Sequence, residues 1–374
     1  MADIGLEGFL GKLRSRDGRT VEYAVAGDDS GEPTLLFYPN GACRHLAALF
    51  DLPAKLANVR LICPNRPGKG GTSCAPKKCH LEMACADAAA CLDHLGVEKA
   101  GMLFMCAGAP FAFSFCAHYP HRISGRLVGC SSWVSPSDCP EARLLYKLGT
   151  HLPTAVLTSV AGIVSTCLRS MPTVLPNFSF SSLSDVSSED LSEDEAAFFC
   201  ADHSGECKAL IARLLEPMQE ETGGEGDDAA VCLAGAKAWG FEYAALGRPV
   251  ALFHGEEDTT VPIECVEWLL SQLPTGSTLY RIPRGTHADV MLFGIRVALC
   301  AITSDNWESS RESSKGSRMF RPRLGRRGLH QPQVLREGSS ASGSAAKPLR
   351  RSSSGGGDGS SSGHDGHSPG SQDA

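Results

Sequence analysis

The feature that most restricts the fold of this 374-residue chain is a regular alternation of short apolar runs with helix-like segments. Short apolar runs bounded by turn residues are typical of buried strands. Here they comprise residues 21–26, 34–38, 60–63, 100–105, 127–130, 249–254 and 278–282. Residues 80–95 have an apolar face at helical spacing, and residues 109–118 form a second helix-like segment. Because strands that alternate with helices favour a parallel sheet, we expect an α/β fold with a mostly parallel central sheet and helices on both faces.

The alternation is interrupted once and then ends. Residues 134–238 contain two helix-like pieces around a stretch rich in serine and acidic residues, which predicts a helical cap inserted into the sheet domain. Residues 306–374 are dominated by serine, glycine, arginine and proline. Such a composition buries too little apolar surface to offset the entropy of the chain. We therefore expect one domain over residues 1–305, followed by a disordered tail.

Charge is divided unevenly between these two parts. The whole chain has a formal charge of −7, whereas residues 305–374 carry 11 Lys and Arg against 7 Asp and Glu. An acidic domain followed by a basic tail is typical of proteins whose tail binds a partner. The alternative is a soluble acidic domain with a flexible terminus that binds nothing. The tail's partner is unknown. The chain lacks the basic excess of nucleic-acid binders, so we expect no nucleic-acid partner.

Cysteine is unusually frequent, with 16 residues scattered through apolar segments. Their spacing fits neither a compact disulfide framework nor a zinc site, so we interpret most of them as buried thiols in a reducing, cytoplasmic compartment. The N-terminus shows no signal-peptide core, and no stretch reaches the about 20 apolar residues of a membrane span. We expect no metal and no stable membrane insertion.

The segment most suggestive of chemistry is Phe104-Met105-Cys106-Ala107-Gly108, where a predicted strand runs directly into a predicted helix. It resembles the G-x-S-x-G elbow of the α/β-hydrolase superfamily, in which a sharp turn exposes a nucleophile. Such a turn needs small residues two positions before and two positions after the nucleophile. Gly108 meets this requirement, whereas Phe104 departs from it, and Cys106 takes the place of the usual serine.

Further landmarks resemble this superfamily, of the AB hydrolase-1 type, in the expected order over residues 17–299. Asp17-Gly-Arg resembles the opening hairpin, and Asn40-Gly41 resembles the His-Gly turn beside the oxyanion hole. Asn65-Arg66-Pro67-Gly68 resembles the start of the D-R-P-G-x-G loop. The segment from Pro249 through Asp258 resembles the strand that leads to the catalytic acid. His287 follows a later strand, where the superfamily places its histidine.

The resemblance implies a role for each of these residues. Cys106 is the nucleophile, His287 the base and Asp258 the acid that orients the imidazole, in the chain order of this fold. The N–H groups of Ala42 and Ala107 form the oxyanion hole. Each assignment has an alternative from the residues alone. Cys106 is alternatively one more buried thiol. Glu256 or Glu257 alternatively takes the role of Asp258 as the acid. His287 alternatively only caps a helix, or His254 takes its role as the base.

Two functions follow from this reading. The first is a hydrolase of a small carboxylic ester, lactone or thioester that works through an acyl-cysteine intermediate and needs no cofactor. A thiolate attacks such substrates readily, and an adjacent imidazole favours the thiolate. The second is a non-catalytic α/β-hydrolase-fold protein that binds or interacts. The intact Asp258 and His287 favour the enzyme, whereas the missing serine, Phe104 and Asn40 favour the binding protein.

Overall fold

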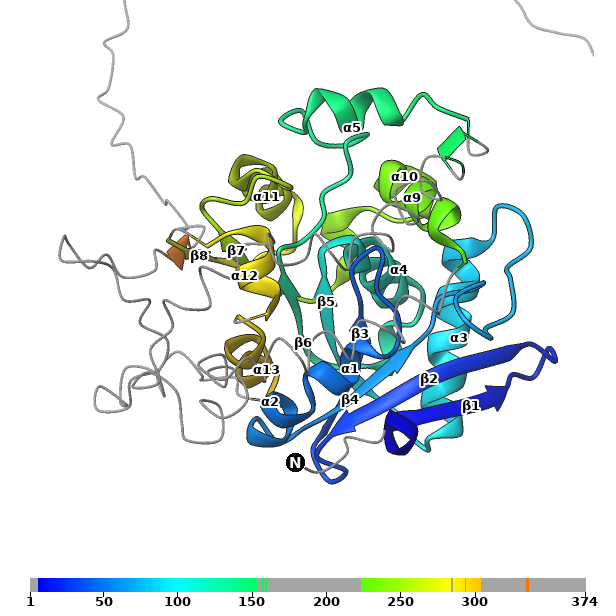
Figure 1. Ribbon diagram of the computed structural model, residues 1–374. Coiled ribbons are helices and arrows are strands. Elements are labelled where there is room, and N and C mark those ends of the chain that lie inside the picture. The colour runs from blue at the N-terminus through cyan, green and yellow to red at the C-terminus, as the bar shows by residue number, and fades with distance from the viewer. Residues whose placement is uncertain are drawn as a thin grey trace, which may run out of the picture. The chain divides into compact units, whose positions relative to one another are not determined.

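The computed structural model describes residues 6–153, 156–157, 159, 223–283, 285–292, 294–303 and 334–335. Its strands form one sheet in the order β1-β2-β4-β3-β5-β6-β7-β8-β9 (Figure 1). The strands are β1 (Leu10–Arg14), β2 (Thr20–Gly27), β3 (Glu32–Phe37), β4 (Val59–Pro64), β5 (Ala100–Met105), β6 (Ile123–Cys130), β7 (Val250–Gly255), β8 (Thr278–Ile282) and β9 (Val334–Leu335). Pairing is parallel from β4 through β8, and β1, β2 and β9 pair antiparallel. The expected mostly parallel sheet is confirmed.

Helices cover both faces of the sheet because alternate residues of each strand point to opposite sides. In β5, Met102 and Phe104 join one apolar cluster, whereas Leu103 and Met105 join the other. The first cluster includes α3 (His80–His94), α4 (Ala109–His118) and α11 (Ile263–Gln272). The second includes α1 (Leu46–Leu49), α2 (Asp51–Leu56) and α13 (Ile295–Thr303). Every residue of β5 is buried, which explains why its sequence is continuously apolar.

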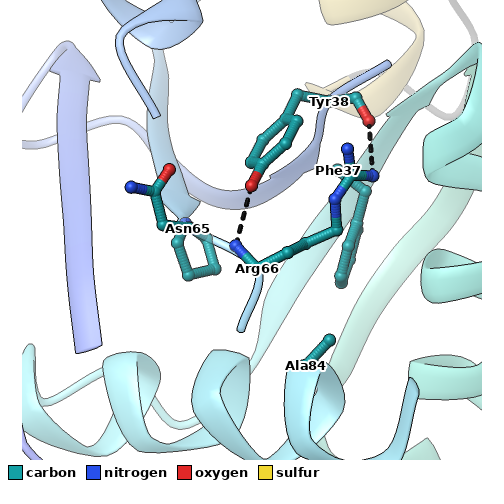
Figure 2. A pocket seen from close by; sticks show the side chains of 6 residues that line it. Phe37, Tyr38, Asn65, Arg66 and Ala84 are labelled. Carbon is teal, nitrogen blue, oxygen red and sulfur yellow. Dashed lines mark hydrogen bonds between the residues drawn. The ribbon is translucent and has the colours of Figure 1, made fainter. Parts of the chain in front are cut away.

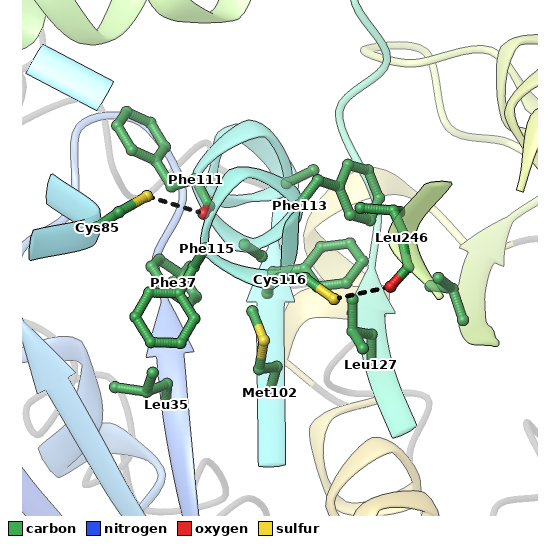
Figure 3. Packing of buried hydrophobic residues seen from close by; sticks show 14 of the residues in the cluster. Leu35, Phe37, Cys85, Met102, Phe111, Phe113, Phe115, Cys116, Leu127 and Leu246 are labelled. Carbon is green, nitrogen blue, oxygen red and sulfur yellow. Dashed lines mark hydrogen bonds between the residues drawn. The ribbon is translucent and has the colours of Figure 1, made fainter. Parts of the chain in front are cut away.

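Helix α4 packs on the central strands of the sheet and forms much of one apolar cluster. Figure 3 shows Phe111, Phe113, Phe115 and Cys116 of this helix beside side chains of the strands beneath it. The strand residues labelled there are Leu35, Phe37, Met102 and Leu127. Because only three residues separate the end of β5 from the start of α4, this packing also fixes the turn between them.

The chain leaves the sheet after β6 and returns to it at β7. The described part of this insertion contains α5 (Leu144–Gly149), α9 (Glu225–Leu233), α10 (Ala236–Trp239) and the 3-10 turn η8 (Tyr243–Leu246). Figure 1 shows α5, α9 and α10 together beyond one end of the sheet. Of these elements, α5 and α9 lie within the expected cap at 134–238, α10 ends one residue beyond it and η8 follows it. Residues 160–222 of the expected cap are outside the described residues.

The tail expected to be disordered, residues 306–374, lies almost wholly outside the described residues. Only Val334–Leu335 are described, and they pair antiparallel with β8. The described cysteines are all free thiols. Among the described residues, no helix is long and apolar enough to cross a membrane.

Candidate active site

The turn between β5 and α4 holds Cys106 in an unusual backbone conformation. Cys106 begins the 3-10 turn η2 (Cys106–Gly108) with a φ of 43°. A non-glycine residue in this left-handed region is strained, and such strain is found where a side chain is held for function. Gly108 is required by close packing, because a Cβ there would lie 2.1 Å from the carbonyl oxygen of Phe37. The turn thus has the geometry of a nucleophile elbow.

Phe104, the large residue that departs from the elbow pattern, fits because the neighbouring strand makes room for it. A Cβ added to Gly129 of β6 would lie 2.3 Å from Cε2 of the Phe104 ring. The ring also packs edge-to-face on Phe113, with the two centroids 5.0 Å apart. The large side chain of Phe104 on β5 is therefore accommodated by the absence of a side chain at Gly129 on the adjacent strand β6.

Gly129→Ala is expected to lower the free energy of unfolding by about 1–3 kcal/mol, because the added methyl overlaps the Phe104 ring. Urea unfolding would measure this cost. Gly8→Ala serves as the control, since a Cβ at Gly8 meets no atom within 4 Å. In a Phe104→Ala background most of the cost of Gly129→Ala is expected to disappear, leaving only the close contact of the added methyl with Leu252. Equal effects of Gly129→Ala in both backgrounds would contradict this account of the elbow.

The histidine and the acid come from two different loops and meet directly. His287 begins α12 (His287–Leu292), and its Nδ1 donates to Oδ2 of Asp258 at 2.7 Å. The other carboxylate oxygen of Asp258 accepts the backbone N–H groups of Thr260 at 2.8 Å and Val261 at 2.9 Å. The Ser131 hydroxyl donates to the His287 carbonyl at 2.9 Å. Both partners of the pair are therefore held by further hydrogen bonds.

Electrostatics link this pair to the cysteine. Burial by itself lowers the pKa of the His287 imidazole, but its hydrogen bonds to Asp258 and Cys106 outweigh burial and raise that pKa to about 10. Burial by itself raises the pKa of the Asp258 carboxyl, yet the hydrogen bond from His287 and the charges of both neighbouring histidines hold it below its ordinary value. The structure thus brings Cys106, His287 and Asp258 together, with His287 in the middle.

The pKa of His287 is expected to fall in Cys106→Ala, because one of the interactions that raise it is removed. An NMR pH titration of the imidazole, with its signals assigned by comparison with His287→Gln, measures this change. Cys74→Ala is the control, since Cys74 is exposed and none of its described contacts is with His287. The same titration midpoint in wild type and Cys106→Ala would contradict the contact.

Of the alternative residues, the two glutamates lie on the surface, whereas His254 lies beside Asp258. Glu256 and Glu257 are exposed, and Glu256 lies 3.7 Å from Arg281. His254 is fully buried, and its Nε2 donates to the carbonyl of Val261 at 2.8 Å. That same nitrogen lies 3.2 Å from Oδ2 of Asp258, the oxygen that also accepts from His287.

The two backbone N–H groups expected to bind an oxyanion, those of Ala42 and Ala107, differ in their hydrogen bonding. Ala107 is the second residue of η2, where backbone N–H groups have no partner within the turn. The N–H of Ala42 donates to the carbonyl of Pro39 at 3.3 Å, which is a long hydrogen bond. Asn40 and Gly41 between them are exposed. The N–H of Ala42 is therefore only weakly bonded to Pro39.

Two residues near the site had not been anticipated from the sequence. The backbone N–H of Trp133 donates to the carbonyl of Cys106 at 3.1 Å, and its indole packs on the Tyr146 ring with the centroids 5.0 Å apart. Burial raises the pKa of Tyr146, and the charges of Cys106 and Asp258 add to this rise. Tyr146 is on α5, in the insertion. The sequence of the insertion carries no motif that predicts a position beside Cys106. Among the described residues, no group of three or more His, Cys, Asp or Glu side chains is placed to hold a metal ion.

Comparisons with known proteins agree with this architecture. No protein-family model matches the sequence. An uncharacterized hydrolase, YcgS of Bacillus subtilis (strain 168), is 33% identical over 140 residues, which is 36% of this chain and 46% of that protein. The chain thus spans about half the length of this relative.

Solved structures match over more of the chain. A hydrolase from Pseudomonas aeruginosa PA01 gives a TM-score of 0.54 at 19% identity, covering 81% of this chain and all of that one. An α/β-hydrolase-fold protein from Nakamurella multipartita gives 0.53 at 19% identity, covering 79% and 100%. With the parallel sheet, the strand–turn–helix elbow and the chain order of the three residues, these matches show that the chain has the α/β-hydrolase fold.

Proposed function

We propose that this protein is a hydrolase of a small carboxylic ester, lactone or thioester, acting through an acyl-enzyme intermediate on Cys106. The observation that carries the proposal is the contact of the Cys106 side chain, at a strained elbow, with a histidine that is bonded to a buried carboxylate. Nucleophile, base and orienting acid are the groups that acyl transfer requires.

The raised pKa of His287 suggests how the first step begins. An imidazole with a pKa of about 10 carries both of its protons at neutral pH, and an imidazolium favours a thiolate on the adjacent cysteine. The Cys106 sulfur attacks the carbonyl carbon, and the carbonyl oxygen becomes the oxyanion. When the bond to the leaving group breaks, the leaving oxygen or sulfur takes a proton from His287.

The second step uses the same residues in reverse. His287, now neutral, takes a proton from water while the water oxygen attacks the acyl-cysteine carbonyl. The carbon–sulfur bond then breaks, which releases the carboxylic acid and restores the thiolate beside the imidazolium. Only water is consumed. Amides are poor substrates for this chemistry, because the thiolate leaves the tetrahedral intermediate more readily than an amine does.

The surroundings of Cys106 point to a substrate contacted from the insertion. Trp133 and Tyr146 offer aromatic surface and one hydroxyl beside the cysteine. The free thiols among the described residues fit a reducing setting, which we propose is the cytoplasm. The basic tail, residues 306–374, is proposed to serve an interaction separate from the chemistry.

The second candidate function is a non-catalytic binding or interaction protein. It is favoured by the N–H of Ala42, which is directed to the Pro39 carbonyl at 3.3 Å rather than left open for an oxyanion. In this alternative the protein binds a ligand or a partner, and Cys106 forms no acyl intermediate.

Trapping the intermediate tests the proposal. The native protein is mixed with short and medium p-nitrophenyl esters and acyl thioesters, quenched in acid, and digested for mass spectrometry. We expect turnover of at least one substrate, with the acyl mass on the peptide that contains Cys106. Exposed Cys74 is the internal control for non-specific acylation. Acylation of Cys74 and Cys106 to the same extent, with no turnover, would favour the binding protein.

A further inference from the structure

A buried arginine lies directly beneath the turn that carries Ala42. Arg66 is 4% exposed, and Figure 2 shows its guanidinium beside Tyr38. Its Nη1 donates to the carbonyl of Tyr38 and its Nη2 to the carbonyl of Pro39, both at 3.1 Å. The backbone N–H of Arg66 donates to the Tyr38 hydroxyl at 2.7 Å. The cavity beside these residues has a volume of about 10 Å³, room for one water at most.

The guanidinium is itself held from several sides. Its Nε lies 3.0 Å from Oδ2 of Asp228 on α9, and the other oxygen of that carboxylate accepts a hydrogen bond from His80 at 2.7 Å. The guanidinium carbon lies 4.1 Å from the ring centroid of Tyr38 and 4.8 Å from that of Phe111 on α4. Because a planar guanidinium donates in fixed directions, its two hydrogen bonds to the carbonyls of Tyr38 and Pro39 restrict its orientation, while Asp228 holds it by charge.

One carbonyl connects Arg66 to Ala42, the proposed oxyanion donor. The Pro39 oxygen accepts both from Nη2 of Arg66 at 3.1 Å and from the N–H of Ala42 at 3.3 Å. A charged donor is the stronger competitor for that oxygen. Arg66 therefore holds the peptide plane of Pro39 in place while the N–H of Ala42 remains only weakly engaged.

We infer that Arg66, oriented by Asp228 of α9, is a positioning residue that holds residues 38–42 in the geometry from which Ala42 donates to the oxyanion. The inference rests on the proposed acyl transfer at Cys106. It assigns a role to an arginine that does not touch the substrate. It also links that turn to the insertion that contains α9.

The same loop and the same helix offer a matched control. Lys69 is 1% exposed, and its Nζ lies 2.8 Å from Oε1 of Glu225, at the start of α9. This pair joins the Arg66 loop to α9 as the Arg66–Asp228 pair does. None of the described hydrogen bonds of the Lys69 side chain reaches residues 38–42. Loss of this pair therefore removes one contact between the loop and α9 while the Arg66–Asp228 pair and the hydrogen bonds of Arg66 to the turn remain.

The experiment compares Arg66→Met, Arg66→Lys and the double variant Lys69→Met/Glu225→Gln in the full chain. In Arg66→Met we expect kcat for a p-nitrophenyl ester to fall about 100-fold, the scale of a lost oxyanion donor, with KM changed less than about threefold. Arg66→Lys keeps the charge beside Asp228 but cannot donate to the carbonyls of Tyr38 and Pro39 together. This variant should therefore fold and still have a reduced kcat. The control should keep kcat within about threefold.

A second readout separates positioning from loss of structure. Iodoacetamide alkylates Cys106 by displacing iodide, a reaction that develops no oxyanion. Its rate at the Cys106 peptide should stay within about threefold of wild type in every variant that folds. Parallel falls in alkylation and kcat, or an equal fall of kcat in the Lys69→Met/Glu225→Gln control, would overturn the inference.

Hydrogen exchange keeps the test independent of turnover. The amides of Gly41 and Ala42 should exchange faster in Arg66→Met or Arg66→Lys than in the control, while the amides of α4 remain unchanged. Equal exchange at Gly41 and Ala42 in all variants would overturn the positioning role. If wild type shows no acyl turnover, the proposed function fails, and exchange alone decides whether Arg66 holds the turn.

Discussion

Cys106→Ala is expected to lose nearly all acyl turnover, whereas Cys106→Ser is expected to keep a measurable part of it. Loss of a nucleophile in a catalytic triad costs about 10³- to 10⁶-fold in kcat, because the remaining groups bind substrate without forming a bond to it. The serine hydroxyl occupies nearly the same place as the thiol at the φ = 43° turn, and His287 is close enough to act as its base. The measurement is steady-state hydrolysis of the ester and thioester panel.

Cys74→Ala is the matched control, since Cys74 is an exposed thiol that takes no part in the candidate site. It should leave turnover unchanged. Turnover that persists in Cys106→Ala would show that the elbow is not the active site. An inert wild type combined with an active Cys106→Ser would mean that the natural protein binds without catalysis.

His287→Ala is expected to be as damaging as Cys106→Ala, since an unassisted thiol is only a few per cent thiolate at neutral pH. Asp258→Asn should also be severely impaired, by about 10⁴-fold where the analogous change has been made in other triads. The reason here is specific: the carboxylate accepts from His287 Nδ1 at 2.7 Å, and an amide can place its NH₂ group there and reverse the imidazole tautomer. Single-turnover acylation of Cys106, followed by mass spectrometry, measures both variants.

Glu257→Gln is the control for the acid, because Glu257 is exposed and one residue away in the chain. It should acylate Cys106 at the wild-type rate. Similar losses in Glu257→Gln and Asp258→Asn would remove Asp258 from the proposed triad, and normal acylation in His287→Ala would remove the histidine.

The fold was predictable where a local pattern was strong. Residues 100–105, 109–118 and 278–282 form β5, α4 and β8 with the expected ends. These segments are continuously apolar or bounded by turn residues, so their local sequence already favours one structure. In contrast, β1 was not predicted as a strand, since its five residues are mostly half-buried or exposed and it is extended through pairing with β2.

What the sequence by itself determined is the parallel α/β architecture and the chain order of Cys106, Asp258 and His287, each after a strand. Short-range periodicity and turn chemistry encode both. Only the tertiary structure decided that Asp258 rather than Glu257 meets His287. It alone decided that Gly129 makes room for Phe104 and that Arg66 donates to the carbonyl of Pro39. These contacts join residues far apart in the chain, and their geometry depends on how strands and helices pack, which no local pattern contains.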